Sequence, residues 1–252
     1  MSDSAKHVGD YGIDGSFHRV SLAGQLAALV IGCCVLVMYA ALALSRGDNW
    51  AGALCLVVVI GVIAQVGIYW HATRSGKFRV WEDLLDELRL RGDETVLDMG
   101  CGRGAVLCAA AKRVPRGRAI GVDLWQADQT DNDAEETLTN AALEGVAGRV
   151  EVHTADMTAV PLDDDSVDLV VSSLAIHNIG SRDARKRALS EAVRVLRPGG
   201  QLAIADLWDV RRHAAALREM GWDDVAWRNL GWRMWYGGPW AATRVVVATK
   251  PR

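Results

Sequence analysis

Two long runs without a single charged side chain dominate the first third of the sequence. No Asp, Glu, Lys or Arg occurs from residue 20 to residue 44, and none occurs from residue 50 to residue 70. A helix of about 20 apolar residues is long enough to cross the hydrocarbon core of a bilayer. The polar turn Ser45-Arg46-Gly47-Asp48-Asn49 joins the runs, so the pattern predicts a hairpin of two transmembrane helices.

Two other interpretations of these runs are weaker. A cleaved signal peptide has a shorter apolar region and is not followed closely by a second long run. A buried hairpin of a soluble protein would keep a charged stripe on at least one helix face. Trp50, Tyr69 and Trp70 bracket the second run, where aromatic rings favour the membrane interface.

Basic residues flank the runs unevenly. Lys6 and Arg19 precede the first run, and only Arg46 lies in the turn. Arg74, Lys77 and Arg79 follow the second run. The positive-inside rule therefore places both termini on the cytoplasmic side of the cell membrane. Small residues in both runs permit close helix packing, either within one chain or in a homo-oligomer.

These observations divide the chain into three predicted parts. Residues 1–19 form a cytoplasmic arm, residues 20–71 carry the two membrane helices, and residues 72–252 form a globular domain. The arm contains Tyr11 and is expected either to fold over a ligand site as a lid or to remain a loose tail. In the first case Tyr11 is a candidate catalytic residue.

Charge and cysteine content exclude several classes of protein. The formal net charge of −3 does not favour a nucleic-acid partner. The five cysteines show no paired C-x-x-C spacing, which predicts neither a metal site nor a disulfide framework. Their presence without such a framework favours a reducing compartment.

Short apolar segments alternate with helical patterns after a linker at residues 71–77. Strands are predicted at residues 95–98, 119–123, 150–153, 167–172, 201–205 and 244–249. Helices are predicted at residues 80–88, 105–113, 134–144, 182–196 and 213–220. Such alternation predicts an α/β domain with a mostly parallel, doubly wound sheet.

A glycine-rich turn follows the first predicted strand. Its residues Gly100, Gly102 and Gly104 let the backbone approach a ligand closely, as they would in a dinucleotide-binding enzyme. Asp98, two residues before the first glycine, would repel a pyrophosphate and suits a ligand that carries an ammonium group. Asp123 ends the second strand and can accept hydrogen bonds from a ribose diol.

Several motifs in order carry a family resemblance. The order D-x-G-x-G-x-G, G-V-D, A-D-M, D-L-V-V-S-S and L-R-P-G-G resembles class I S-adenosylmethionine-dependent methyltransferases, and within them the ubiquinone/menaquinone-methyltransferase-like superfamily. The chain also resembles a bacterial group with an N-terminal transmembrane hairpin. This resemblance implies a Rossmann-like seven-stranded sheet with one antiparallel strand, at residues 244–249, and S-adenosyl-L-methionine as the cofactor.

The candidate cofactor contacts follow from these motifs. In the A-D-M motif, Asp156 can accept from the adenine amino group while Met157 packs on the ring. Trp125 is expected to pack against the adenosine. The full set of candidates is Asp98, Gly100, Cys101, Gly102, Gly104, Asp123, Leu124, Trp125, Asp156, Met157, Ser172 and Ser173.

Residues for the methyl acceptor are less strongly indicated. Methyl transfer from a sulfonium depends mainly on positioning, so no catalytic triad is expected. His177 follows the fourth strand, where such sheets bind ligands, and is a candidate base or substrate contact; its alternative role is to cap a turn. Aromatic residues around Gly237-Gly238-Pro239 predict a substrate wall or cation cage, or packing near the membrane: Trp208, Trp232, Trp235, Tyr236 and Trp240.

The leading hypothesis is a membrane-anchored methyltransferase. It would act on an O, N or S atom of a small, lipophilic or aromatic acceptor at the cytoplasmic membrane face. One alternative is a membrane module that binds the cofactor without catalysis. A nicotinamide-dependent oxidoreductase is a third interpretation, which Asp98 disfavours.

Overall fold

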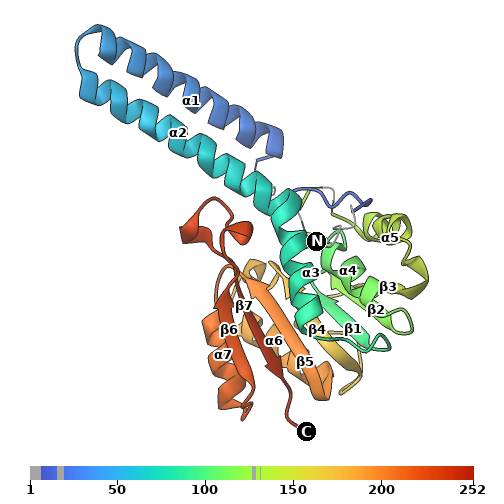
Figure 1. Cartoon of the computed structure of the whole chain (residues 1–252). Coiled ribbons are helices and arrows are strands. Elements are labelled where there is room, and N and C mark those ends of the chain that lie inside the picture. Colours follow the sequence, from blue (N-terminus) through green and yellow to red (C-terminus); the bar gives the residue numbers. More distant parts are fainter. Residues whose placement is uncertain (1–6, 16–19, 127–128, 131) are drawn as a thin grey trace.

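A long helical hairpin projects from an α/β domain (Figure 1). The computed structural model describes residues 7–15, 20–126, 129–130 and 132–252. Lys6 and Arg19, which contribute to the predicted membrane orientation, lie outside the described residues, as does the rest of residues 1–6 and 16–19.

The hairpin consists of α1 (Leu22–Ser45) and α2 (Asn49–His71). Each helix begins at a polar side chain that accepts a backbone N–H of its first turn: Ser21 accepts from Gly24, and Asp48 accepts from Ala51. The apolar residues between these caps form helices that are long and apolar enough to cross a membrane, by length and composition.

The surface of the hairpin is apolar on every side. Ala40, Ala43, Gly52 and Val59 are the buried residues of α1 and α2. Many large apolar side chains elsewhere on the two helices are exposed, and Ile60 at the middle of α2 is 66% exposed. Water would have to solvate this continuous apolar surface, which monomeric soluble proteins rarely present.

The predicted linker at residues 71–77 is wrong, because the chain there is helical. A π-helical turn, Ala72–Gly76, joins α2 directly to α3 (Lys77–Glu87). Gly76 packs against the backbone of Arg233, so closely that a Cβ atom at residue 76 would lie 1.8 Å from the Arg233 carbonyl oxygen. This tertiary contact therefore helps to hold the segment in a helix.

The sheet has seven strands in the order β3-β2-β1-β4-β5-β7-β6. The strands are β1 (Thr95–Met99), β2 (Arg118–Asp123), β3 (Val150–Thr154), β4 (Val167–Ser173), β5 (Leu196–Asp206), β6 (Val225–Asn229) and β7 (Arg244–Thr249). β7 runs antiparallel to both β5 and β6, whereas β1 to β5 run parallel to one another. The expected seven-stranded methyltransferase sheet is thus confirmed.

Individual elements differ from the sequence-based predictions at the edge of the sheet. Strand β6 has no counterpart among the strands predicted from hydrophobic pattern, because four of its five residues are exposed and no apolar alternation marks it. Helix α7 (Val210–Glu219) begins three residues earlier than predicted. β5 begins directly after α6 (Arg182–Val195), so it includes the L-R-P-G-G motif at residues 196–200 and starts five residues earlier than predicted.

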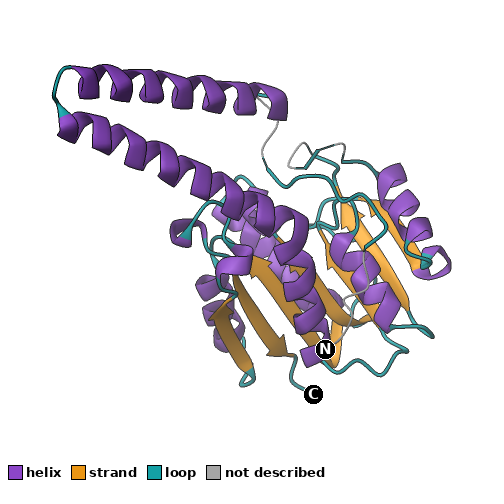
Figure 2. Cartoon of the chain, turned by 45° about the horizontal axis from the view of Figure 1, so that its top comes forward, coloured by secondary structure: helices purple, strands orange, loops and turns teal. Residues whose placement is uncertain are grey.

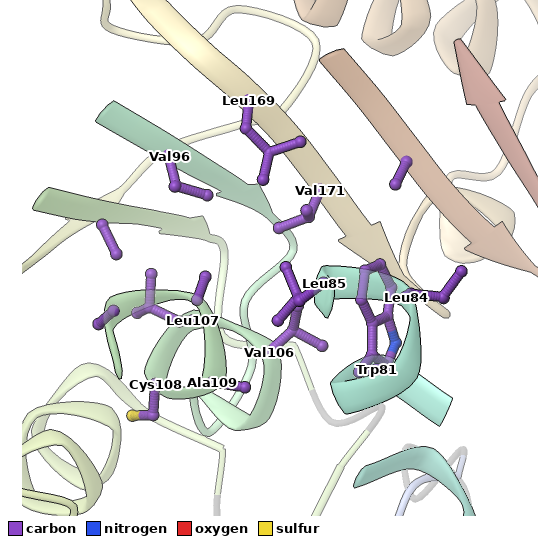
Figure 3. Packing of buried hydrophobic residues seen from close by; sticks show 14 of the residues in the cluster. Trp81, Leu84, Leu85, Val96, Val106, Leu107, Cys108, Ala109, Leu169 and Val171 are labelled. Atoms are coloured by element: carbon purple, nitrogen blue, oxygen red, sulfur yellow. The ribbon is translucent and has the colours of Figure 1, made fainter. Parts of the chain in front are cut away.

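Helices cover both faces of the sheet (Figure 2). On one face lie α3, α4 (Ala105–Arg113) and α5 (Ala134–Leu143), and on the other lie α6 and α7. In the first layer, Trp81 and Leu85 of α3 pack with Val106 of α4 against Val171 of β4 (Figure 3). This packing fixes α3, and with it the base of the hairpin, beside the carboxyl ends of β1 and β4.

Replacing Gly76 tests how the hairpin joins the domain. We expect Gly76→Ala to lower the free energy of unfolding by about 1–3 kcal/mol, because the new methyl group meets the backbone of Arg233 and not a flexible side chain. Gly67→Ala is the matched control on α2, since a Cβ atom there meets nothing within 4 Å. Thermal unfolding of the full chain in detergent measures both, and an unchanged Gly76→Ala protein would contradict the packing described.

Candidate active site

The glycine-rich turn between β1 and α4 has the backbone shape that its sequence demands. Gly100, Gly102 and Gly104 have φ values of +76°, +49° and +84°, in the left-handed region that side chains disfavour. A Cβ atom on Gly100 would also lie 2.2 Å from the Cβ of Ala175, which follows β4. The turn therefore brings bare backbone to the edge of a cleft at the carboxyl ends of the strands.

Two adjoining hollows form this cleft, and both are lined by Gly100, Asp123 and Ala175. The first hollow is completed by Asp14, Lys77, Asp98, Cys101, Gly102, Ala105, Val106, Gln129, Ser173 and Leu174. The second is completed by Leu124, Gln126, Ala155, Asp156, Met157, Asn178 and Ile179. The candidates Asp98, Cys101, Asp156 and Met157 are thus brought together around one cleft.

Asp98 occupies the floor of the first hollow. Its side chain is fully buried, and neither carboxylate oxygen has a hydrogen-bond partner of good geometry among the described residues, although the nearby Leu107 backbone N–H acts to lower its pKa. Burial raises the pKa of Asp98 to about 8, and the neighbouring negative charge of Asp123 adds to the shift. An isolated buried carboxylate is costly, and a cationic ligand in the hollow would remove that cost.

Asp123 joins the second strand to the glycine-rich turn. One carboxylate oxygen accepts the Gly102 N–H at 2.8 Å, and the other accepts the Trp125 N–H at 2.7 Å. Burial raises the pKa of Asp123, although these backbone donors act in the opposite direction. Its carboxylate is thereby oriented at the junction of the two hollows, where a ribose would connect an adenine to the rest of a nucleoside ligand.

The described part of the N-terminal arm covers the first hollow, which Asp14 lines. The Asp14 carboxylate accepts from Lys77 Nζ at 2.8 Å, from Gln129 Nε2 at 3.0 Å and from the Tyr236 hydroxyl at 2.9 Å. The Tyr69 hydroxyl of α2 donates to the Asp14 carbonyl oxygen. Sequence reasoning missed Asp14, Lys77 and Gln129, because no motif marks residues that come together only through tertiary contacts.

Tyr11 lies in the arm but not in the cleft. Its hydroxyl donates to Glu144 at 3.1 Å, and its ring packs against Phe78 at a centroid distance of 5.3 Å. Burial raises the pKa of the Tyr11 phenol far above its ordinary value, and nearby Cys108 and Glu144 raise it further. From this position Tyr11 anchors the arm to the domain, and the position does not support a catalytic role.

Three other cofactor candidates take up different positions. The Trp125 indole donates to Thr154 at 2.7 Å and packs on the core, so Leu124 and Gln126 line the second hollow in its place. The Ser172 hydroxyl donates to the Met99 carbonyl oxygen inside the sheet, whereas Ser173 lines the first hollow and accepts from Trp81 Nε1.

His177 lies beyond the cleft, in the short helix Ile176–Asn178. Its Nδ1 is 2.6 Å from Oδ1 of Asp206, and its backbone N–H donates to the other oxygen of the same carboxylate at 2.9 Å. Asp206, at the end of β5, is buried and was not predicted as a site residue. Although Nδ1 forms no hydrogen bond of good geometry, the close approach of Asp206 leaves Nε2 as the nitrogen available to a ligand.

The predicted aromatic wall is divided in the structure. Tyr236 meets Tyr69 edge to face at 5.9 Å, and Trp232 stacks on His71 at 4.7 Å, so both pack on the base of α2. Trp240 is exposed and lies in the same loop. Trp208 follows β5 and lines a separate cavity. Trp235 is half-buried, and its backbone bridges to Ala242.

The charges of the first hollow test the fit of a methyl donor. Asp14, Asp98 and Asp123 face a single ammonium, that of Lys77, among the described lining residues. This balance suits S-adenosylmethionine, which carries a sulfonium and an ammonium group, and it opposes a pyrophosphate. The strand order also differs from the dinucleotide-binding order 3-2-1-4-5-6, because β7 is inserted between β5 and β6.

Comparison with known proteins agrees with this geometry. Residues 97–204 match the family model described as a methyltransferase domain. The chain is 32% identical over 162 residues to a ubiquinone/menaquinone biosynthesis C-methyltransferase of Dinoroseobacter shibae, covering 64% of this chain and 61% of that protein. It is 36% identical over 115 residues to an arsenite methyltransferase of Halobacterium salinarum, covering 45% of this chain and 27% of the relative. The chain therefore spans less than two thirds of either relative.

Solved structures share the fold at low sequence identity. A S-adenosylmethionine-dependent methyltransferase from Aquifex aeolicus superimposes with a TM-score of 0.52 at 23% identity, covering 67% of this chain and 88% of that one. The [4+2]-cyclase SpnF gives a TM-score of 0.55 at 21% identity, covering 68% and 79%. Residues 97–204 thus resemble a methyltransferase domain in sequence, and the chain shares the fold of S-adenosylmethionine-dependent methyltransferases.

The stability of the protein without ligand tests the state of Asp98. Its carboxyl has a raised pKa in the folded state, about 8 against 3.8 in an unperturbed chain, so the folded state holds a proton that the unfolded state releases. This proton makes stability fall as pH rises through the window between those two values. We expect Asp98→Asn to remove that fall and to be more stable than the parent protein at pH 8. Chemical denaturation between pH 5 and pH 9 measures it, and an equal pH dependence in the two proteins would contradict the assignment.

Proposed function

We propose that this protein transfers the methyl group of S-adenosylmethionine to a small, lipophilic or aromatic acceptor at the cytoplasmic face of the membrane that α1 and α2 cross. The observation that carries the proposal is the buried, unpartnered carboxylate of Asp98 beneath the glycine-rich turn. A cationic ligand would compensate this carboxylate once it ionises, and the adjoining Asp123 offers a ribose contact in the same cleft.

Different residues of the cleft would contact different parts of the cofactor. Asp98 would hold the ammonium group, Asp123 the ribose hydroxyls, and Leu124 and Met157 the adenine. Lys77 would face the carboxylate of the methionine part, since it supplies the ammonium group of that hollow. When bound, the cofactor supplies an electrophilic methyl group on a good leaving group, so positioning of the acceptor is the main task left to the protein.

His177 is the residue we assign to proton removal. An acceptor hydroxyl or amine must lose a proton when it gains a methyl group, and a fixed imidazole can take that proton on Nε2. The buried carboxylate of Asp206 would then stabilise the imidazolium at Nδ1. The quinone-pathway relative carries the name C-methyltransferase, so we extend the proposed acceptor atoms from O, N and S to carbon.

The position of the N-terminal arm over the first hollow supports the hypothesis that the arm is a lid over the cofactor. The first hollow has a volume of only about 70 Å³ with Asp14 in place, so the cofactor needs the arm or its neighbours to move. Once bound, it would lie beneath Asp14, Lys77 and Gln129 and away from water. The backbone N–H groups of Val8 and Gly9 each donate a hydrogen bond of 2.9 Å to the Glu144 carboxylate. These bonds would keep residues 8 and 9 attached to the domain while the rest of the arm moves.

A lipophilic acceptor is favoured by where the cleft lies. The hairpin leaves the domain at the carboxyl edge of the sheet, the same edge that carries the glycine-rich turn and His177 (Figure 1). With α1 and α2 in lipid, this edge would face the membrane surface. An acceptor dissolved in the bilayer would then reach the cleft without crossing bulk water.

The alternative function is a membrane module that binds the cofactor without catalysis. It differs from the proposed enzyme in one experimental outcome, the transfer of a methyl group. Both functions require binding, which calorimetric titration of the full chain with S-adenosylhomocysteine measures. Only the enzyme would move tritium from labelled S-adenosylmethionine into material extracted from bacterial membranes. Asp98→Asn is the control, because it should fold and yet lose both signals. No binding at millimolar cofactor would refute both functions.

Replacement of His177 tests the proton transfer. For an acceptor whose nucleophile starts protonated, we expect His177→Asn to lower kcat by about 10²–10⁴-fold, because an amide cannot take the proton. The affinity for S-adenosylhomocysteine should stay within about twofold. His153→Asn, on β3 beside Glu151, is the control. Equal kcat values for the His177→Asn and parent enzymes would exclude a base at this residue.

A charge at the centre of α2 tests the membrane assignment. We expect Ile60→Arg to reduce the fraction of protein retained in alkali-washed membranes, because arginine at the centre of a spanning helix costs about 2.5–3.5 kcal/mol. Leu138→Arg, at an exposed position on α5, makes the same charge change in the domain and should have no effect. If Ile60→Arg is retained as well as Leu138→Arg, α2 is not in lipid.

A further inference from the structure

A cavity rich in arginine lies beside the proposed acceptor site. It is open, has a volume of about 740 Å³, and its lining includes Gly180, Leu207 and Trp208. Five guanidinium groups line it, those of Arg182, Arg185, Arg211, Arg212 and Arg244. Asp209 is the one carboxylate among its described lining residues, so the cavity carries a strong positive charge.

The fold gathers these arginines from three separate elements. Arg182 opens α6, Arg211 and Arg212 lie in the first turn of α7, and Arg244 begins β7. In the β5–β7 ladder Arg244 stands opposite Asp206, the residue that holds His177. The arginines therefore converge at the carboxyl edge of the sheet, next to the histidine that we assign to the acceptor.

Asp209 compensates only part of this charge. It pairs with Arg185 at 2.6 Å and also with Arg212. Arg211 lies over the ring of Trp227 at 4.5 Å. Arg182 and Arg244 form no ion pair with any residue that the structure describes. Repulsion among these cations would be relieved by an anion bound between them.

The start of α7 is a second feature of the cavity that points to an anion. Asp209 is the N-cap of this ten-residue helix, but its side chain makes no capping hydrogen bond because it faces the arginines. The N–H groups of the first turn are left open at the positive end of the helix dipole. Helix N-termini of this kind, combined with arginines, form binding sites for phosphate groups.

We propose that this cavity binds a phosphate or diphosphate group. The cavity and the cofactor cleft are joined by one stretch of chain after β4, in which Ala175 lines the cleft, His177 follows and Gly180 lines the cavity. A molecule with its phosphate among the arginines would therefore extend an apolar part past His177 toward the methyl donor. The phosphate belongs either to the acceptor itself or to a headgroup of the surrounding lipid. The role of the site in acceptor binding rests on the proposed function, whereas the presence of the site does not.

Calorimetry on the full chain in phosphatidylcholine nanodiscs tests the site. Inorganic pyrophosphate represents a phosphorylated acceptor, and glycerophosphoglycerol represents an anionic lipid headgroup. We expect binding that the double variant Arg182→Gln/Arg212→Gln weakens by about tenfold or more, because two charge-assisted contacts are lost. The double variant Lys186→Gln/Arg187→Gln removes two charges from exposed positions of the same helix α6 and should bind as the parent does.

Each outcome has a defined meaning. Tighter binding of pyrophosphate assigns the site to a phosphorylated acceptor, and comparable or tighter binding of glycerophosphoglycerol assigns it to a lipid headgroup. Absence of binding by both probes, or equal loss in the two double variants, would overturn the proposal. S-Adenosylhomocysteine is titrated into the same samples: its binding without any anion binding refutes the anion site alone, whereas its failure to bind refutes the proposed function.

Discussion

The carboxylate of Asp14 holds together segments that are far apart in the sequence. It accepts hydrogen bonds from Lys77 of α3, Gln129 of the loop before α5 and Tyr236 of the loop before β7. The Lys77–Asp14 pair is largely buried, and breaking such a pair by removing one partner typically costs about 3–5 kcal/mol. The arm, the base of the hairpin and the roof of the cleft thus depend on one charge.

A second carboxylate, that of Asp98, has the opposite character. It lines the same hollow as Asp14, but its carboxylate accepts no hydrogen bond of good geometry from the described residues, and Lys77, the one cation among the described lining residues, pairs with Asp14. The free protein keeps it neutral near pH 7, since its pKa is raised to about 8. Asp14 therefore stabilises the closed arm, while Asp98 stores an unfavourable interaction that a cationic ligand relieves.

Local sequence predicted the floor of the cleft well. Gly100, Gly102 and Asp98 are adjacent in the chain, and the backbone shape of the turn alone places them together. The uncharged runs and the polar turn between them likewise predicted the two long helices. These features depend on residues a few positions apart, so their spacing carries the information.

The parts that sequence did not reveal depend on tertiary contact. Asp14 and Lys77 are 63 positions apart, and no local pattern pairs them. The expected linker became a helical turn because Gly76 packs against residue 233, and strand β6 forms because β7 offers a hydrogen-bonding edge. Trp125 follows a candidate ribose-binding position, yet its half-buried ring packs against the core and its indole N–H donates to the exposed Thr154.

The proton balance of cofactor binding tests the central claim about Asp98 most directly. Titration with S-adenosylhomocysteine at pH 7 in two buffers of different ionisation enthalpy gives the number of protons released on binding. We expect about one, since a carboxyl with a pKa of about 8 must ionise to bind the ammonium group. Binding of S-adenosylhomocysteine without proton release would show that Asp98 is already ionised in the free protein, and would contradict its role as the uncompensated acid of the cleft.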